Sequence, residues 1–299
     1  MTEQKIDNLP PCPDRPSDAH KGTFGTVIVV GGCATMMGAP ALVASAALRS
    51  GAGLAKIATV AQAIPTVLAL EPCATAIERS EDSGAQLAEL RKADRDEKAV
   101  LAVGPGLGRD ESASDLVLAV LPTGRPMVLD ADGLNCLSDS LPTDCLPREA
   151  PLIVTPHPGE FRRLAKAVGI AADISSQKGR IAGAIALSKV FGCVVLLKGQ
   201  STIVTDGTKI RVNQTGNPAM ATGGSGDVLT GMIAGLLAQG MTAFDAASLG
   251  AHLHGSAGDL WRDAFGPSGM TARDLLPRIA PAFAQHRRSF SGGSDGPQT

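Results

Sequence analysis

A glycine-rich stretch that runs into an apolar helix constrains this chain more than any other feature. Residues 213–240 read NQTGNPAMATGGSGDVLTGMIAGLLAQG. Gly216, Gly223, Gly224 and Gly226 lie within eleven residues, ahead of a run with the apolar spacing of a buried helix. A glycine-rich loop that enters a helix leaves unpaired backbone N–H groups at the positive end of the helix dipole. The stretch therefore predicts an anion site.

Asp227 stands at the mouth of this predicted anion site, and it has two interpretations. An acid is a poor phosphate ligand because like charges repel, but it can take a proton from a hydroxyl as that oxygen meets a phosphoryl group. The alternative is a helix N-cap, since Ser-Gly-Asp before an apolar run is common capping chemistry. A cap needs no glycine, whereas a backbone that closely approaches a ligand does. The neighbouring glycines therefore favour the catalytic interpretation.

Composition argues against several classes of function. Of 299 residues, 44% are apolar and only 3% aromatic, which suits a sheet covered by helices and not a stacking platform for single-stranded nucleic acid. The net charge of −2 provides no electrostatic attraction to nucleic acid or to an anionic membrane. No apolar run approaches the roughly 20 residues of a membrane span. Six scattered cysteines without a C-x-x-C pair, and a polar N-terminus unlike a signal peptide, predict reduced thiols in a cytoplasmic protein.

Short β-rich runs alternate with helical ones, which predicts an α/β fold with a mostly parallel sheet and helices on both faces. We expect a proline-rich arm over 1–20, one domain over 21–286 and a disordered tail over 287–299. Asp206-Gly207 reads as a hairpin turn, so an antiparallel pair should join the sheet near its edge. The predicted strands cover 26–30, 56–60, 99–103, 126–129, 152–155, 193–197, 201–205 and 209–212. The predicted helices cover 39–50, 61–70, 83–93, 111–121, 158–168, 175–191, 227–239, 243–262 and 272–285.

Small, polar and charged residues follow the predicted strands, at the edge where open α/β sheets bind ligands. These residues are Gly31, Gly32, Cys33, the GPGLG segment 104–108, Asp130, Asp132, Asn135, Pro156, His157, Glu160, Lys198 and Gly199. Any one of them could be turn chemistry, but together they predict a site along this edge.

Several of these residues keep two interpretations. Lys198 could reach solvent from a strand end or meet nucleotide phosphate. His157, between two prolines, could be a hydrogen-bonded structural residue or a functional one. Asp130 and Asp132 could hold hydrated Mg²⁺ through water or cap the turn. The GPGLG segment lacks the spacing and the trailing lysine of a P-loop. His252 and His254 are two residues apart, so they do not share a helix face and predict no metal pair.

Taken in order, the motifs of residues 20 to 283 resemble those of the ADP-dependent NAD(P)H-hydrate dehydratases, a family of the ribokinase-like superfamily. The matching segments are HKGTFGTVIVVGG, MMGAPALVASAALRSGAGL, VGPGLGR, VLDADGLN, VTPHPGEFRRL, LLKGQST, NPAMATGGSGDVLTGMIAGLLAQG and AHLHGSAGD. The resemblance implies a ribokinase-like fold and a repair lyase that restores NADH or NADPH from its 6-hydroxy adduct. It implies ADP or ATP as phosphoryl donor, magnesium as the accompanying ion, and AMP and phosphate as products with ADP.

The resemblance also implies roles for individual residues. Asp227 would be the base on the 6-hydroxyl group. The phosphoryl group would be held by Gly223, Gly224, Ser225 and Gly226. The adenine nucleotide would be lined by Lys198, Gly199, Gln200, Ser201, Thr202 and Gly226. The hydrate would contact Ala39, Gly106, His157 and Asp227.

One position departs from the family, which often has Gly-Ser where this chain has Gly32-Cys33. A thiol is a weaker hydrogen-bond partner than a hydroxyl, so a polar role for position 33 is in doubt. Many relatives carry an N-terminal epimerase domain for which this chain is too short, so we expect a separate NAD(P)H-hydrate epimerase as functional partner. The family also implies a homo-oligomer. Two alternatives are a ribokinase-like kinase of a small vitamin alcohol and a catalytically silent nucleotide-binding regulator; an intact Asp227 argues against the second.

Overall fold

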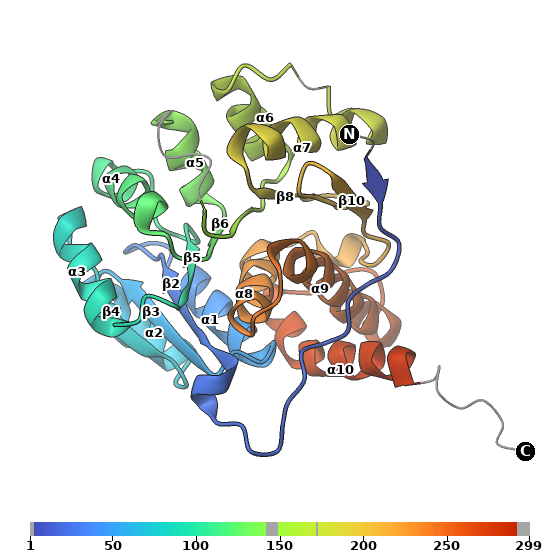
Figure 1. Ribbon diagram of the computed structural model, residues 1–299. Coiled ribbons are helices and arrows are strands. Elements are labelled where there is room, and N and C mark those ends of the chain that lie inside the picture. The colour runs from blue at the N-terminus through green and yellow to red at the C-terminus, as the bar shows by residue number, and fades with distance from the viewer. Residues whose placement is uncertain (1–2, 142–148, 172, 292–299) are drawn as a thin grey trace, which may run out of the picture.

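The computed structural model describes residues 3–141, 149–171 and 173–291, and their strands form one sheet. The ten strands of this part of the chain lie in the order β1-β10-β9-β8-β7-β6-β5-β2-β3-β4 (Figure 1). Their bounds are β1 Gln4–Lys5, β2 Thr26–Val30, β3 Leu54–Thr59, β4 Thr75–Glu78, β5 Val100–Val103, β6 Met127–Leu129, β7 Leu152–Val154, β8 Val194–Leu197, β9 Ile203–Thr205 and β10 Lys209–Val212.

The sheet is parallel except at β9, which pairs antiparallel with both β8 and β10. The turn between β9 and β10 has Gly207 at φ 89°, a backbone conformation that glycine adopts freely. The Asp206 carboxylate accepts hydrogen bonds from the N–H groups of Thr208 and Lys209 at 3.0 and 2.7 Å. The predicted hairpin and the mostly parallel sheet are confirmed.

Helices cover both faces of the sheet (Figure 1). One face carries α1 Gly38–Arg49, α2 Ile64–Leu70, α8 Ser225–Ala238, α9 Ala243–Phe265 and α10 Ala272–Ser291; the other carries α3 Ser83–Ala93, α4 Glu111–Val120, α5 Asp132–Asp139, α6 Pro158–Ala167 and α7 Gln177–Phe191. Successive strand residues point to opposite faces. Two hydrophobic cores result, the first on the face covered by α1, α2, α8, α9 and α10 and the second on the opposite face. In β2, Val27 and Val29 pack in the first core, and Ile28 and Val30 pack in the second.

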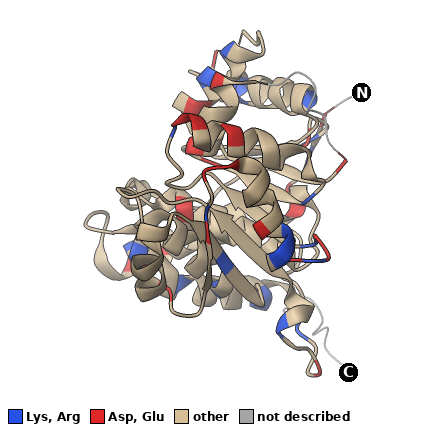
Figure 2. Cartoon of the chain, turned by 90° about the vertical axis from the view of Figure 1, so that its left-hand side faces the viewer, with Lys and Arg blue, Asp and Glu red and all other residues tan. Residues whose placement is uncertain are grey.

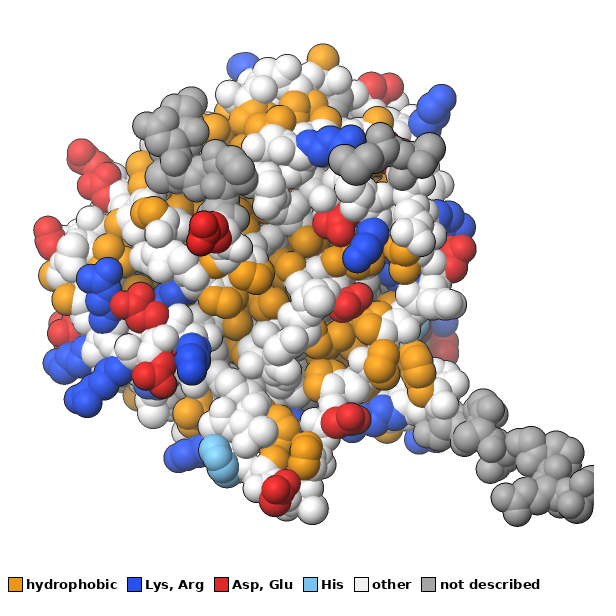
Figure 3. All heavy atoms as spheres, viewed as in Figure 1, with side chains coloured by type: hydrophobic (Ala, Val, Ile, Leu, Met, Phe, Trp, Pro, Cys, Tyr) orange, Lys and Arg blue, Asp and Glu red, His pale blue; other side chains and the backbone are white. Residues whose placement is uncertain are grey.

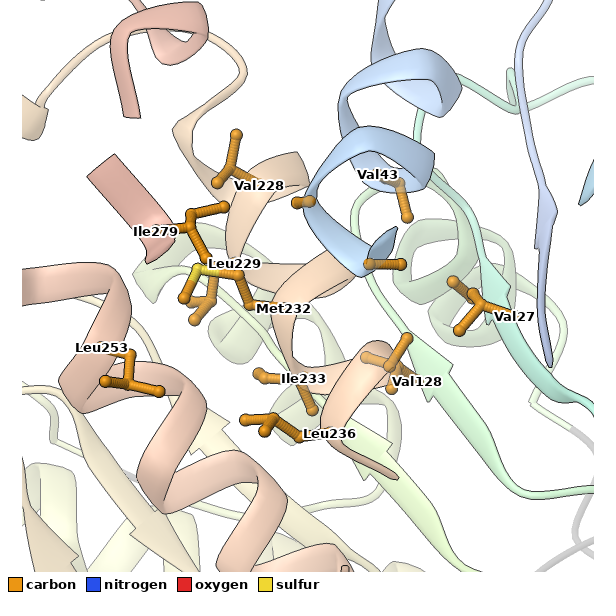
Figure 4. Close-up of a cluster of buried hydrophobic side chains, with 14 of the residues drawn as sticks. Val27, Val43, Val128, Val228, Leu229, Met232, Ile233, Leu236, Leu253 and Ile279 are labelled. Carbon is orange, nitrogen blue, oxygen red and sulfur yellow. The ribbon is translucent and has the colours of Figure 1, made fainter. Parts of the chain in front are cut away.

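Helix α8, which carries the glycine-rich stretch, packs deep in the first core (Figure 4). Met232 and Ile233 are completely buried there. The helix lies close against α1, since a Cβ at Gly231 would be 2.2 Å from the carbonyl oxygen of Val43. This close approach requires glycine and brings the backbones of α8 and α1 together. None of the described helices is long and apolar enough to cross a membrane.

Apart from shifts of up to three residues in other bounds, four strands or α-helices differ from the sequence prediction. Strand β1 was not predicted because two exposed residues, paired parallel to β10, carry no hydrophobic pattern. Strand β4 is an edge strand of four residues, too short for a clear alternation. Helix α5 lies where DADGLN reads as turn chemistry. Helix α10 continues through residues 287–291, which the prediction assigned to the tail; residues 292–299 are outside the described part.

Candidate active site

Lys198 lies at the end of β8 and makes the central ion pair of the site. Its Nζ donates to Oδ1 of Asp130 at 2.7 Å and lies 3.8 Å from Oε2 of Glu160. The other oxygen of Asp130 accepts a hydrogen bond of 2.6 Å from the hydroxyl of Thr230 in α8. Asp130 is 1% exposed and the Lys198 side chain 19%. The lysine therefore turns inward along the sheet edge, and the alternative of a solvent-reaching lysine is wrong.

The surrounding acids keep this lysine charged. Burial lowers the pKa of Lys198, but Asp130, Glu160 and Asp227 outweigh that effect, and the pKa is raised overall. Burial conversely raises the pKa of Glu160 to about 7, against the lowering effect of Lys198. The cluster can thus present a fixed cation to a phosphate while its acids share the compensating charge.

The glycine-rich loop covers this ion pair. A Cβ at Gly226 would lie 3.4 Å from Nζ of Lys198 and 3.8 Å from Oδ2 of Asp130. Gly224, at φ 86°, is the N-cap residue of α8, and no described side chain accepts a hydrogen bond from the first N–H groups of the helix at this position. The first N–H groups of a helix lack intrahelical acceptors, and here they lie next to an ammonium group. The start of α8 and a largely buried cation therefore lie together, as the predicted anion site requires.

Asp227 is the third residue of α8, not its cap. Within the described chain, no hydrogen-bond donor reaches its carboxylate, so the N-cap interpretation is wrong. Burial, and then the charge of Asp130, raise the pKa of Asp227 to about 7, while Lys198 opposes the shift. An acid with a pKa near neutrality and no competing partner is suited to general-base chemistry.

The residues expected to contact the hydrate come from four segments: α1, the loop after β5, the start of α6, and α8, which carries Asp227. Gly106, after β5, has φ 64°, and a Cβ there would lie 3.1 Å from the Cβ of Ala39 on α1. His157 caps α6: its Nδ1 accepts from the N–H of Gly159 at 2.9 Å, and Glu160 returns a bond to the N–H of His157 at 2.7 Å. The structural interpretation of His157 is therefore correct, yet its side chain stays half exposed. Burial, followed by Lys198 and Arg163, lowers the pKa of His157, so its ring is neutral.

Arg180 on α7 holds the loop expected to contact the nucleotide, and sequence reasoning missed it. Its guanidinium donates to the carbonyl oxygens of Lys198 at 3.2 Å and Leu197 at 3.4 Å, and also to that of Gln200. The loop turns sharply, with Gly199 at φ 129° and Ser201 at φ 53°. The five residues 198–202 are thus shaped by an arginine from another element. The amphipathic pattern of α7 contains no signal for this role.

Other missed residues support the glycine-rich loop. Asp259 on α9 holds the glycine-rich loop with both carboxylate oxygens. One accepts a hydrogen bond from the N–H of Gly216 at 2.9 Å, and the other accepts one from Nδ2 of Asn217 at 2.8 Å. His254 is 8% exposed with its Nε2 3.4 Å from the Ser225 hydroxyl, and burial lowers its pKa to about 4. The AHLHGSAGD motif therefore supports the loop from behind.

The acids after β6 are engaged by protein groups. Asp130 is bound by Lys198 and Thr230, and Oδ2 of Asp132 accepts from the N–H of Gly108 at 3.0 Å. No group of three or more His, Cys, Asp or Glu side chains in the described residues is arranged to hold a metal ion. Neither side chain caps the turn before α5, whose N-cap Ala131 receives no side-chain bond; both acids instead bind groups of other segments.

Comparison with known proteins identifies the family. Residues 27–281 match the family model described as NAD(P)H-hydrate dehydratase. The chain belongs to this family. Over 273 residues it is 42% identical to the ADP-dependent (S)-NAD(P)H-hydrate dehydratase of Neisseria meningitidis, covering 90% of this chain and 86% of that protein. It is 44% identical to the bifunctional NAD(P)H-hydrate repair enzyme Nnr of Moorella thermoacetica, of which it spans half the length.

Solved structures confirm the ribokinase-like fold of this family member. The ADP/ATP-dependent NAD(P)H-hydrate dehydratase of Bacillus subtilis, co-crystallised with ATP/Mg²⁺, is 31% identical with a TM-score of 0.77, covering 94% of this chain and all of that one. Ribokinase of Arabidopsis thaliana, at 13% identity and a TM-score of 0.54, shares the fold alone. The resemblance of the motifs to the dehydratases is therefore confirmed.

Proposed function

We propose that this dehydratase-family chain converts the S epimer of hydrated NADH or NADPH back to NAD(P)H, with ADP as phosphoryl donor. The observation that carries the proposal is Asp227, an unpaired carboxylate with a pKa of about 7 beside a glycine-rich helix N-terminus. Such a pair of features suits phosphorylation of a hydroxyl group. The names of its relatives specify the hydroxyl as that of the hydrate.

The chemistry proceeds in two stages. Asp227 takes the proton of the 6-hydroxyl as its oxygen attacks the terminal phosphorus of ADP, and the bond to AMP breaks. The ring nitrogen then donates its electron pair, the C6–O bond breaks, and phosphate leaves. Loss of a proton from C5 restores the ring double bond. Phosphorylation is needed because hydroxide is a poor leaving group, whereas phosphate is a good one.

Each part of the site supplies one contribution to this reaction. The N–H groups from Gly223 to Gly226 and the Lys198 ammonium would stabilise the transferred phosphoryl group. The loop 198–202, shaped by Arg180, would bind the adenine nucleotide. Ala39, Gly106 and the neutral ring of His157 would position the hydrate. With Asp130 and Asp132 occupied by protein donors, the chain would bind Mg²⁺ chiefly through the nucleotide phosphates, where the ion would neutralise developing charge.

The setting of the enzyme follows from the same proposal. Relatives are named for the S hydrate, so an epimerase that converts the other epimer is the expected functional partner. The described cysteines Cys12, Cys33, Cys73, Cys136 and Cys193 are free thiols, which supports a reducing, cytoplasmic location. Cys145 lies outside the described residues. A homo-oligomer remains our expectation from the family.

The test is recovery of the reduced-nicotinamide absorbance when the protein is incubated with hydrated NADH, Mg²⁺ and ADP. Recovery should require the nucleotide and should produce one AMP per NADH. Equal recovery without nucleotide would show that phosphorylation is not the mechanism. A stable phosphorylated product would support the vitamin-alcohol kinase instead.

A further inference from the structure

Arg79 brings a positive charge to the hydrate side of the site. It directly follows the edge strand β4, and its backbone N–H donates to the carbonyl oxygen of Thr59 at 2.7 Å. Its Nη1 donates at 3.4 Å to the carbonyl oxygen of Leu107, the residue after Gly106. The half-buried guanidinium therefore lies one residue from an expected hydrate contact.

Arg79 differs from the neighbouring cations because no carboxylate lies close to it. The other cations of this edge are engaged: Lys198 by Asp130 at 2.7 Å, Arg109 by Asp139 at 2.6 Å and Arg163 by Oδ1 of Asn135 at 2.8 Å. Over residues 3–141, 149–171 and 173–291, no carboxylate lies within 4.0 Å of the Arg79 guanidinium.

The surroundings leave this guanidinium free to donate. Burial lowers the pKa of Arg79, while Asp110, Cys33 and Glu81 raise it without forming an ion pair. An arginine side chain has five N–H donors, and here the described contacts are a single long hydrogen bond to a carbonyl. The group is partly desolvated with most of its donors unused, which is the state of an anion-recognition residue before its ligand binds.

A surface pocket gives the side chain access to a ligand. It has a volume of about 750 Å³, and its lining includes Glu78, Arg79 and Ser80 at the end of β4 and Ala85, Glu89 and Lys92 of α3. Figure 3 shows charged side chains gathered at the margin where Figure 1 places α3 and β4. Lys92 in this pocket is already paired with Glu89 at 3.5 Å.

We propose that Arg79 binds a phosphate group of the dinucleotide hydrate. This inference rests on the proposed function, because it concerns the substrate of the same site. Both hydrates contain a pyrophosphate, and hydrated NADPH has a further phosphate on its adenosine ribose. Of the expected hydrate contacts, Ala39 and Gly106 have no charge, His157 is neutral and Asp227 is acidic. The substrate phosphates need a cation on this side, and an arginine fork matches phosphate geometry.

The experiment compares Arg79→Gln and Arg79→Lys with Lys92→Gln, a matched control that removes one positive charge from the same pocket. Steady-state kinetics are measured with both hydrates at saturating ADP. Arg79→Gln should raise KM about 10- to 100-fold, as expected for a lost charge-assisted bond, with kcat within about 2-fold. Arg79→Lys should be intermediate, and Lys92→Gln should equal the parent. An effect confined to hydrated NADPH assigns Arg79 to the ribose phosphate; equal effects assign it to the pyrophosphate.

Unchanged KM for both hydrates in Arg79→Gln, or an equal change in Lys92→Gln, would overturn the inference. If Arg79→Gln does not fold, the Arg79→Lys variant decides, because a merely structural cation would leave its KM at the parental value. An unaltered dissociation constant for ADP, measured by calorimetry, is expected. A parent protein that is inactive on both hydrates would refute the proposed function; an active parent with unchanged Arg79→Gln refutes only this inference.

Discussion

Nζ of Lys198 lies 2.7 Å from Oδ1 of Asp130, and these residues are 68 positions apart in the chain. The pair joins the ends of β8 and β6 beneath the glycine-rich loop. Elsewhere in the described chain, acidic and basic residues are intermingled along the ribbon (Figure 2). A cation held in this way is available to a nucleotide phosphate without having to be reoriented, which is the electrostatic advantage of a preorganised site.

Replacing Lys198 with alanine should weaken nucleotide binding more than hydrate binding. Loss of one charge-assisted contact costs about 1.5–3 kcal/mol, measurable by calorimetry with ADP. The change also leaves Asp130 buried without its cation, which costs up to about 3–5 kcal/mol of the free energy of unfolding. Adding Asp130→Asn should recover part of that stability but none of the affinity. Unchanged ADP affinity in a folded single variant would remove Lys198 from the nucleotide site.

The Asp227→Asn variant tests the proposed base. It should fold normally, bind ADP at least as well as the parent because one negative charge near phosphate is lost, and turn over roughly 10²–10⁴-fold more slowly. Single-turnover kinetics and ADP calorimetry separate the two effects. A folded Asn variant that keeps nearly full turnover would falsify the assignment.

Turnover of the parent should depend on pH through Asp227. The base must be ionised, and its pKa is raised to about 7, so kcat should fall as pH decreases below neutrality. Glu160 titrates in the same range, so the fall of kcat on the acidic side of the pH profile reports on both carboxyl groups. A kcat that stays constant from pH 8 to pH 5.5 would contradict a base of this pKa.

The same shift has a consequence for stability. Because the folded-state pKa of Asp227 lies above its unfolded value, the folded state binds more protons between about pH 4 and pH 7. The contribution of this group to the free energy of unfolding therefore decreases as pH rises through that window. Asp227→Asn removes the ionisable group, so its melting temperature relative to the parent should rise from pH 4 to pH 8. Urea unfolding at both pH values checks the sign.

Gly226→Ala tests whether glycine is required at this position for ADP binding and not for the stability of α8. The new Cβ would lie 3.4 Å from Lys198 Nζ, which is ordinary van der Waals contact. Alanine favours a helix over glycine by about 1 kcal/mol, so stability should not fall, but the methyl group enters the phosphoryl space. We expect ADP affinity to fall at least about 10-fold, or about 1.4 kcal/mol. The control is Gly231→Ala, whose Cβ would lie 2.2 Å from the Val43 carbonyl oxygen and should destabilise the fold. Tight ADP binding by Gly226→Ala would contradict the model of the loop.

The sequence by itself determined the elements and the edge of the sheet at which the site lies. Apolar periodicity reports local burial, so β2 and α3 were predicted with the bounds that the structure has. The order of strands and helices placed Lys198, Asp130 and the glycine-rich loop at one edge. The matching motifs specified the family, since their order along the chain is itself linear information.

Only the tertiary structure decided which side chains meet. The Thr230–Asp130 bond spans 100 positions, and the Arg180 contacts with residues 197–200 depend on how α7 packs against the sheet. Sequence reasoning left Asp227 between a cap and a base, because both interpretations fit Ser-Gly-Asp before a helix. The structure excludes the cap, because α8 begins two residues before Asp227. Burial and the charge of Asp130 raise its pKa, which supports the base that we propose. Such effects depend on distances between segments remote in sequence, which local patterns do not encode.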